Sequence, residues 1–581
     1  MNIKIDLNKR DLLTIIVLSI VFFSLAAWNL GATQTPVTTA QIAAGQEFYV
    51  DLGSTTTVKS VVLLLKGGSF NLTLSAGSPD NWQVVASNVA FPYNSENQRW
   101  SEEYYKWHEV SIQQTTRYIK FTFNLSPHNT IIAEIAVIDT SDQQIPIALI
   151  NGTDSENQAR NLIDEQDKIQ YPFTYYSQTF FDEIYYVRTA EQYLNLQVPY
   201  EWTHPPLGKL VIASGIAAFG YNPFGWRIMG VIAATLIIPL IYILGKKLFG
   251  TWIGAFASAF LLTFDFMHFT MARMATVDTY VVLFSLASQL FFLIYLKHVL
   301  KNGWNAPVQP LFLAILFFAL GFSTKWLVLY GFAGQLALLA LLRLREVAKL
   351  KKSLSDKIYA FTDHPFSVVI GFLLVAVLVY FLTYIPDMLA GRSVLDVLGL
   401  QGGMLNYHAT LTATHPFSSP WWTWPFILRP VWLYVSYLPL SVKSTIVLLG
   451  NPAVWWVGFT CIVLLAVELV KPVIAAVKRL SYKIDFPAMF ITVFFFFQWV
   501  PYMLISRVTF IYHFYVNLPF LCLATAYFIS KYWSSKWVKV AAIAYFAGTV
   551  ALFWLFYVVL SGMPASQSWI DSLKWLNGWG F

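Results

Sequence analysis

Residues 227–247 read RIMGVIAATLIIPLIYILGKK, an apolar run that begins at an arginine and ends at two lysines. A run of this length and composition can cross the hydrocarbon core of a bilayer as a helix. Similar apolar blocks, separated by short basic segments, recur along most of the 581 residues. The chain is therefore predicted to be a polytopic α-helical membrane protein.

The composition excludes an ordinary soluble protein. Only 12% of the residues are charged and 57% are hydrophobic, whereas soluble domains carry roughly a quarter charged residues. The excess of 38 Lys and Arg over 31 Asp and Glu is interpreted as loop topology, and no nucleic-acid partner is expected. The only cysteines, Cys461 and Cys522, lie in apolar blocks, so neither a disulfide framework nor a thiolate zinc site is expected.

About eleven spans are expected. Residues 12–30 follow a basic start and are interpreted as an uncleaved span, because no small-residue cleavage site stands out after them. Residues 205–221 are interrupted by Gly and Pro, which favours an interfacial helix. The other spans are predicted at residues 227–244, 252–264, 276–296, 311–322, 327–342, 367–385, 454–469, 488–504, 510–529 and 538–560.

The basic clusters predict the orientation. With a cytoplasmic N-terminus, alternation of the spans places every Lys/Arg cluster inside, as the positive-inside rule requires. The segment around Asp182, the long loop 387–451 and the C-terminus then lie outside, in a multi-pass protein of the cell membrane. The inner clusters are Lys246 with Lys247, Lys297 with Lys301, and the segments 343–357, 471–483 and 531–539.

Residues 34–148 differ from the rest of the chain. They are polar and alternating, with strand-like runs at 48–52, 58–65 and 118–123 between glycine-containing turns, which predicts a β-sandwich. Residues 50–53, Trp82, 117–120 and 132–137 resemble a discoidin-type, galactose-binding jelly roll. Two roles are open for this domain. Its loops could bind sugar or acceptor, or the whole domain could be a rigid non-catalytic cap. The expected division is 1–33 (N-terminus and first helix), 34–148 (sandwich), 149–225 (first outer loop) and 226–581 (membrane domain).

Ionisable and aromatic residues from separated segments converge on the outer face. Charged groups are costly at the membrane, so each is a candidate for function. An acidic pair can supply a general base, arginines can bind a lipid phosphate, and aromatic rings can stack on a sugar. A phosphoprenyl sugar donor attacked by a hydroxyl would use all three. The candidates are Asp182, Glu183, His204, Lys209, Arg227, Arg273, Asp278, Lys325, Tyr407, His408, His415, Trp421, Arg429, Arg507 and His513.

These residues carry a family resemblance over roughly residues 179–560. The chain resembles the protein O-mannosyltransferases, GT-C glycosyltransferases with eleven spans. The resemblance implies transfer of mannose, with inversion and without a metal or other cofactor, from a polyprenyl (dolichyl) phosphate to Ser/Thr hydroxyls of proteins. The matching motifs are Asp182-Glu183, 204–209, Ala272-Arg273-Met274 with Asp278, Lys325-Trp326, the run 407–430, Asn451-Pro452 with Trp455-Trp456, and 507–513.

The resemblance also implies roles. Asp182 would be the base and Glu183 would hold the acceptor or orient the site, while Arg227 would hold the carrier phosphate. The chain differs in two features from the fungal and animal members of that family. Loop 387–451 is too short for the MIR domain found there, and the N-terminal sandwich is an addition. A single chain and a dimer both remain open. Lys209, Arg273, Lys325, Arg429 and Arg507 are further donor contacts, and His204, Tyr407, His408, His415, Trp421 and His513 are sugar or acceptor contacts.

Each residue also has a simpler interpretation. Arg227 and Lys209 could simply be boundary residues whose charged ends reach the membrane interface. Arg273 with Asp278 could be only an ion pair that packs a helical hairpin, and Trp421 an interfacial anchor. A zinc site is disfavoured because no His pair has helical i,i+4 spacing. The competing functions are sugar transfer to a lipid or envelope glycan, a transporter, and a surface-binding protein. A transporter is disfavoured by the lack of an internal repeat.

Overall fold

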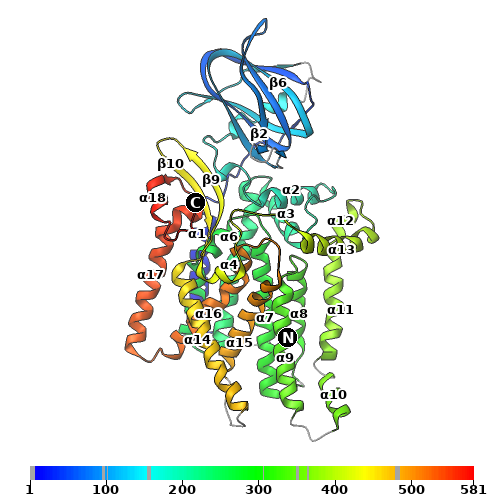
Figure 1. Ribbon diagram of the computed structural model, residues 1–581, viewed down its shortest axis with the longest axis vertical. Helices are drawn as coiled ribbons and strands as arrows, with labels where there is room; N and C mark the ends of the chain where they lie inside the picture. Colours follow the sequence, from blue (N-terminus) through cyan, green and yellow to red (C-terminus); the bar gives the residue numbers. More distant parts are fainter. Residues whose placement is uncertain are drawn as a thin grey trace. The chain divides into compact units, whose positions relative to one another are not determined.

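The computed structural model describes residues 7–94, 99–100, 103–152, 159–304, 306–348, 353–362, 366–477 and 485–581 (Figure 1). The chain forms two compact units. The helical unit comprises Met1–Trp28, Thr189–Ser214 and Arg227–Phe581, and the β unit comprises Asn29–Arg188 and Gly215–Trp226. Several residues of the predicted inner clusters lie outside the described residues, namely Lys349, Lys351, Lys352, Lys478, Arg479 and Lys483.

Long apolar helices dominate the helical unit. Within the described residues, nine segments are long and apolar enough to cross a membrane, which confirms a multi-pass membrane protein. They are α1 (Lys9–Ala27), α4 (Pro223–Phe249), α7 (Asp278–Asn302), α9 (Val328–Val347), α10 to α12 (Leu354–Thr362, Phe366–Leu382, Ile385–Leu389), α14 (Pro452–Val477), α15 with η5 (Phe486–Trp499, Val500–Leu504), η6 with α16 (Ile511–Asn517, Leu518–Lys531) and α17 (Lys536–Ser561).

Two further predicted spans are helical but less regular. The segment predicted at 252–264 is the first half of a pair, α5 (Trp252–Thr263) and α6 (Phe266–Ala272), that bends by 58° and brings the number of candidate spans to ten among the described residues. The segment predicted at 311–322 is α8 (Gln309–Phe322), which has 14 residues. The apolar segment predicted to be interfacial is α3 (Leu207–Phe219), of 13 residues. The count of eleven spans stays a prediction.

The β unit is built on one sheet of order β1-β6-β2-β3, with β7 and β8 paired at its sides. Its long strands β2 (Glu47–Ser78) and β6 (Lys106–Asp139) pair antiparallel in several registers, for example Val50 with Ile119 and Val61 with Val137. Alternate apolar side chains of these strands are buried and form the core, as the alternating pattern predicted. The other strands are β1 (Ala40–Ile42), β3 (Asn81–Phe91), β7 (Gln144–Ile145) and β8 (Leu149–Gly152), and β4 (Tyr93–Asn94) pairs with β5 (Arg99–Trp100) separately.

The predicted outer loop 387–451 contains regular structure. After α12 come α13 (Val394–Thr410), which begins at a Ser393 capping box, and η4 (Trp421–Phe426). A hairpin follows, with β9 (Val431–Leu438) paired to β10 (Val442–Leu448), and β11 (Ala565–Ser566) joins it from the C-terminal segment. Figure 1 shows α12 and α13 at one end of α11, with α10 at its other end.

A glycine allows α3 to pack closely on the helices that carry the site. A Cβ added at Gly208 would lie 2.6 Å from Val277 Cγ1 and 3.0 Å from Thr324 Cγ2. The Leu207 N–H donates to the Ser323 carbonyl at 3.0 Å. The start of α3 is therefore fixed against the start of α7 and the turn between α8 and α9.

Candidate active site

Five of the predicted site residues line one cavity of the helical unit. The cavity has a volume of about 270 Å³. It is enclosed by the segment before α3, the turn into α9, the end of α13 and the segment between η5 and η6. The predicted residues that line it are His204, Lys325, His408, Arg507 and His513, and Thr203, Trp326, Tyr330, Tyr502 and Thr509 line it with them.

The cavity carries positive charge. Lys325 Nζ donates to Asp278 Oδ1 at 2.8 Å, so Asp278 pairs with Lys325 and not with Arg273. Arg507 is half-buried and has no ion-pair partner among the residues that the structure describes. None of the described residues lining the cavity is a carboxylate. This arrangement favours an anionic group, and an arginine is suited to binding a phosphate through two parallel hydrogen bonds.

A buried carboxylate that was not predicted, Glu201, organises the segment before α3. Lys209 Nζ donates to Glu201 Oε2 at 2.6 Å and to the carbonyls of Glu201 and His204 at 2.7 Å each. All three ammonium protons of Lys209 are thus engaged. Burial alone would raise the pKa of the Glu201 carboxyl, but the Lys209 ammonium and His204 outweigh it and hold that pKa well below its usual range. Lys209 therefore positions this segment.

Two histidines meet at the cavity wall. The rings of His204 and His408 pack edge to face with centroids 5.2 Å apart. His204 Nδ1 lies 3.1 Å from Glu201 Oε1, and His408 Nε2 lies 2.9 Å from the Thr203 carbonyl oxygen. Burial, and after it the neighbouring His204 and Arg507, lowers the pKa of His408 to about 4. His408 is therefore neutral near pH 7.

Aromatic rings close the other side of the cavity. The ring of His513 stacks on Trp424 with centroids 6.0 Å apart and meets Tyr502 edge to face at 5.5 Å. Tyr502 also packs edge to face against Trp424 at 4.9 Å. The Trp424 Nε1–H donates to Ser419 Oγ at 3.1 Å. The three rings of Trp424, Tyr502 and His513 are therefore buried and packed against one another.

The remaining predicted contacts in the helical unit do not line this cavity. The Arg273 guanidinium donates to the carbonyls of Ala26 and Trp28 at 2.7 Å each and to that of Ser561 at 3.3 Å, so it joins the ends of α1 and α17. Arg227 is fully buried near the start of α4, and Arg429 is exposed. Tyr407 packs against Trp202, His415 against Phe510, and Trp421 against Trp499.

The predicted acidic pair belongs to the β unit, at the start of α2 (Glu183–Leu194). Glu183 is fully buried, and its Oε2 accepts the Phe180 N–H at 3.2 Å. Asp182 is half-buried. Phe181, directly before it, has a φ of 50°, a backbone conformation that costs energy for an aromatic residue and recurs at functional sites. The pair thus combines one buried, anchored carboxylate and one more accessible carboxylate.

Glu201 and Tyr502 are the most informative of the residues near the site that were not predicted from the sequence. Glu201 is a single acid in a polar segment, and no periodicity connects it to Lys209. Tyr502 lies within an apolar aromatic run, where it is indistinguishable from a packing residue. The one signal for Glu201 was its position, four residues before the Pro205-Pro206 pair that precedes a helix. Nothing in the sequence singles out Tyr502.

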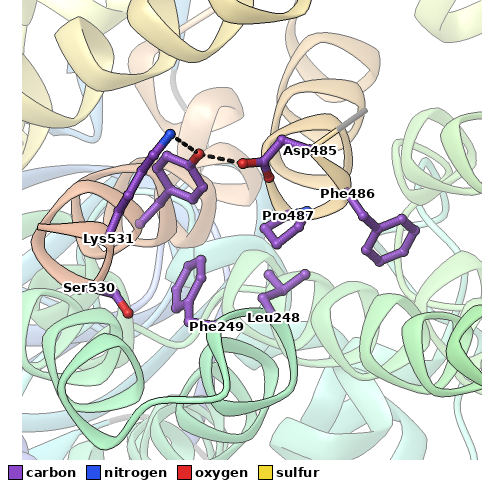
Figure 2. Close-up of a pocket in the computed structure, with 8 residues that line it drawn as sticks. Leu248, Phe249, Asp485, Phe486, Pro487, Ser530 and Lys531 are labelled. Atoms are coloured by element: carbon purple, nitrogen blue, oxygen red, sulfur yellow. Dashed lines mark hydrogen bonds between the residues drawn. The ribbon is translucent and has the colours of Figure 1, made fainter. Parts of the chain in front are cut away.

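A second cavity, of about 550 Å³, is formed by the end of α4, the start of α15 and the end of α16. It therefore lies at the opposite ends of α15 and α16 from the first cavity. Figure 2 shows Lys531 joined to Asp485 through the hydroxyl of Tyr527, with hydrogen bonds of 2.9 and 2.6 Å. Its charged groups thus satisfy one another, and none of the predicted site residues lines it.

Comparison with known families agrees with this geometry. Residues 393–579 match a sequence-family model described as the C-terminal four TMM region of protein-O-mannosyltransferase. Residues 203–370 match a second family model, described as dolichyl-phosphate-mannose-protein mannosyltransferase. The chain belongs to the protein O-mannosyltransferase family. It is therefore a membrane glycosyltransferase, and the two matched regions together contain the segments that enclose the first cavity.

Curated relatives support this membership. The polyprenol-phosphate-mannose–protein mannosyltransferase of Mycobacterium tuberculosis is 26% identical over 475 residues, which cover 69% of this chain and 86% of the relative. The protein of the same name from Mycolicibacterium smegmatis is 24% identical over 444 residues, covering 65% and 81%.

A solved structure shows the fold. The S. cerevisiae protein O-mannosyltransferase Pmt1–Pmt2 complex bound to the sugar donor aligns with a TM-score of 0.58 at 13% identity, over 69% of this chain and 89% of that chain. The GT-C fold predicted for the helical unit is thus confirmed. The discoidin resemblance of residues 34–148 stays a prediction.

Proposed function

We propose that this protein O-mannosyltransferase transfers mannose from a polyprenyl (dolichyl) phosphate carrier to serine and threonine hydroxyls of proteins on the extracytoplasmic face. The observation that carries the proposal is Arg507, a half-buried cation without an ion-pair partner among the described residues, which shares its cavity with Lys325. The names of the mycobacterial relatives support the donor.

The proposed reaction is a direct displacement with inversion. The acceptor hydroxyl oxygen attacks the anomeric carbon of mannose, and the bond from that carbon to the phosphate oxygen breaks. The phosphate leaves with the electron pair, and a carboxylate takes the hydroxyl proton. Arg507 and Lys325 stabilise the negative charge that develops on the leaving phosphate, which is the kind of electrostatic assistance that contributes most to such reactions.

In this proposal Asp182 is the base and Glu183 orients it. The difference in burial supports these roles, because a fully buried Glu183 that accepts the Phe180 N–H is engaged in holding the turn. Asp182 is the more accessible of the two. The same assignment follows from the family resemblance of the pair.

We further propose that the transfer needs no metal ion. The donor set of the cavity supports this for Mg²⁺ and Mn²⁺, which prefer oxygen ligands, since its lining offers cations for a phosphate and no carboxylate among the described residues. Activity in excess EDTA, measured beside activity with added Mg²⁺ or Mn²⁺, should be unchanged. Loss in EDTA that one of these metals restores would contradict this part.

The acceptor class is tested by competition in one assay. The full-length protein in lipid nanodiscs is given radiolabelled polyprenyl phosphate mannose with a mixture of Ser/Thr peptides and a membrane lipid extract. Label on peptide, removable by β-elimination, is the expected result. Label that appears on lipid or glycan alone would replace the protein acceptor by an envelope acceptor.

The orientation and the assembly belong to the same proposal. A cytoplasmic N-terminus, with the β unit and the C-terminus outside, is supported by the placement of the basic clusters. Labelling of single cysteines in intact cells tests it, and labelling of the N-terminus from outside would overturn it. The yeast neighbour is a Pmt1–Pmt2 complex, and the mass of the purified protein will distinguish a single chain from a similar pair.

A further inference from the structure

Two buried polar atoms on the wall of the first cavity lack a hydrogen-bond partner among the described residues. They are Nδ1 of His408 and the hydroxyl oxygen of Tyr502. Buried polar groups in folded proteins are almost always hydrogen-bonded, so each exception needs an explanation. Both exceptions lie on the same cavity as Arg507 and Lys325, which points to a ligand as the missing partner.

The contact of His408 with Thr203 fixes which ring nitrogen carries the proton. The Thr203 carbonyl oxygen only accepts hydrogen bonds, and it lies 2.9 Å from His408 Nε2, so Nε2 must donate. In a neutral imidazole the other nitrogen is then an acceptor with a free lone pair. The pKa of His408, lowered to about 4 chiefly by burial, agrees with a neutral ring. His408 thus needs a donor, and a sugar hydroxyl is one.

The hydroxyl of Tyr502 is held in place by its ring. That ring packs edge to face against Trp424, His513 and Tyr330, with centroids 4.9, 5.5 and 5.7 Å away. A phenol hydroxyl both donates and accepts. The cavity therefore offers one obligate acceptor and one adaptable group in addition to its cations.

A glycosyl phosphate matches this set of groups. Its phosphate requires cations, and its sugar carries several hydroxyls within a few ångströms of that phosphate. We propose that His408 Nδ1 accepts a hydrogen bond from a hydroxyl of the donor sugar, with the Tyr502 hydroxyl as a second contact, and that His408 thereby determines sugar specificity. This inference rests on the proposed function, because it assigns the sugar part of the same donor.

The His408 side chain allows a matched pair of variants. In His408→Gln the amide NH₂ can take the place of Nε2 and keep the bond to Thr203, while the acceptor at Nδ1 is lost. In His408→Asn the amide oxygen can replace Nδ1, while the bond to Thr203 is lost. Tyr502→Phe removes only the hydroxyl. If His408 has only a structural role, the two variants should differ only in stability, through the bond to Thr203 that His408→Gln keeps and His408→Asn loses.

The test compares the mannosyl donor with its 2-, 3-, 4- and 6-deoxy analogues. In the wild type, one deoxy donor should lose roughly 10-fold or more in kcat/KM, as sites built to bind a hydroxyl do. In His408→Gln that particular penalty should fall to about 1-fold while the other penalties persist, and in His408→Asn it should be largely kept. The same penalty pattern in wild type and His408→Gln would overturn the proposal.

Binding is measured beside transfer, as the shift in thermal unfolding that each donor causes. If the wild type binds the mannosyl donor but transfers nothing to any acceptor, the proposed function fails, while the deoxy series still tests His408 through binding. If His408→Gln does not fold, His408→Asn and Tyr502→Phe are decisive. A penalty that His408→Asn abolishes, or a pattern of penalties that Tyr502→Phe leaves identical to that of the wild type, would then refute the inference even when transfer to peptide is normal.

Discussion

Arg507 illustrates how much depends on a single side chain in this site. It is half-buried in the wall of the first cavity, and no carboxylate among the described residues neutralises it. Lys325 in the same wall is already paired with Asp278. A charge held without a partner near the membrane is costly, which is reasonable for a residue whose partner is a substrate phosphate.

The first prediction concerns this arginine. Arg507→Gln should reduce kcat/KM for the lipid-linked donor by about 10- to 100-fold, because charge-assisted hydrogen bonds to phosphate are among the strong ones. Much of the loss should appear as a raised KM. Initial rates at varied donor concentration measure it, with the exposed Arg160→Gln of the β unit as the matched control. Equal kinetics in the two variants would rule out Arg507 as the phosphate ligand.

At the residue scale, the sequence predicted which residues belong to the site better than it predicted their hydrogen-bond and ion-pair partners. His204, Lys325, His408, Arg507 and His513 were all predicted and line one cavity. The partners of Lys209 and Asp278 were not predictable, because they depend on how a loop folds back and on how three helices meet. Tyr502 was missed because its polarity is one hydroxyl on a buried ring.

At the element scale, the start of α3 controls the shape of the site. Gly208 packs against Val277 and Thr324 with no room for a Cβ, which keeps α3 close to the turn that carries Lys325. The second prediction is that Gly208→Ala destabilises the protein by about 1–3 kcal/mol through overpacking. Gly371→Ala in α11, where a Cβ would meet nothing within 4 Å, should be neutral or stabilising by up to about 1 kcal/mol. Thermal unfolding in one detergent compares them, and equal shifts would contradict the packing argument.

The joint between α13 and the segment before α3 should respond to pH. The pKa of His408 falls from 6.5 to about 4 on folding, so the unfolded chain takes up this proton first as the pH falls. The unfolding free energy should therefore decrease between about pH 6.5 and pH 4 and be constant with respect to this group above that range. The unfolding temperature should fall less steeply over this range in His408→Gln than in the wild type. Identical slopes would show that His408 does not titrate as described.

Elements with a strong local signal were predicted, and the hairpin of β9 and β10 was not. The long apolar blocks form helices because a helix satisfies all its backbone hydrogen bonds within one segment, as the bilayer core requires. In contrast, the turn between β9 and β10 has positive φ at Leu440 and Ser441, of 60° and 58°. Turns of this kind normally carry Asn-Gly, so Leu-Ser gave no sign of a hairpin.

At the scale of the whole molecule, the chain combines a GT-C helical unit with a separate β unit. Composition and the long apolar blocks predicted the membrane class, and the alternating pattern of residues 34–148 predicted a β-rich unit. The count of eleven spans stays a prediction, because α5 and α6 bend by 58° and α8 has 14 residues. The family membership depends on two matched regions, residues 203–370 and 393–579, and both contribute residues to the first cavity.

The measurement that tests the central claim most directly is mannose transfer by the full-length protein in nanodiscs, wild type beside Asp182→Asn. Radiolabelled polyprenyl phosphate mannose and a Ser/Thr peptide mixture are the substrates, and donor binding is followed in parallel. We expect label on peptide in the wild type, a loss of roughly 10²- to 10⁴-fold in Asp182→Asn, as for removal of a general base, and unchanged donor binding. Full turnover by Asp182→Asn, or no peptide labelling by a wild type that binds the donor, would contradict this account.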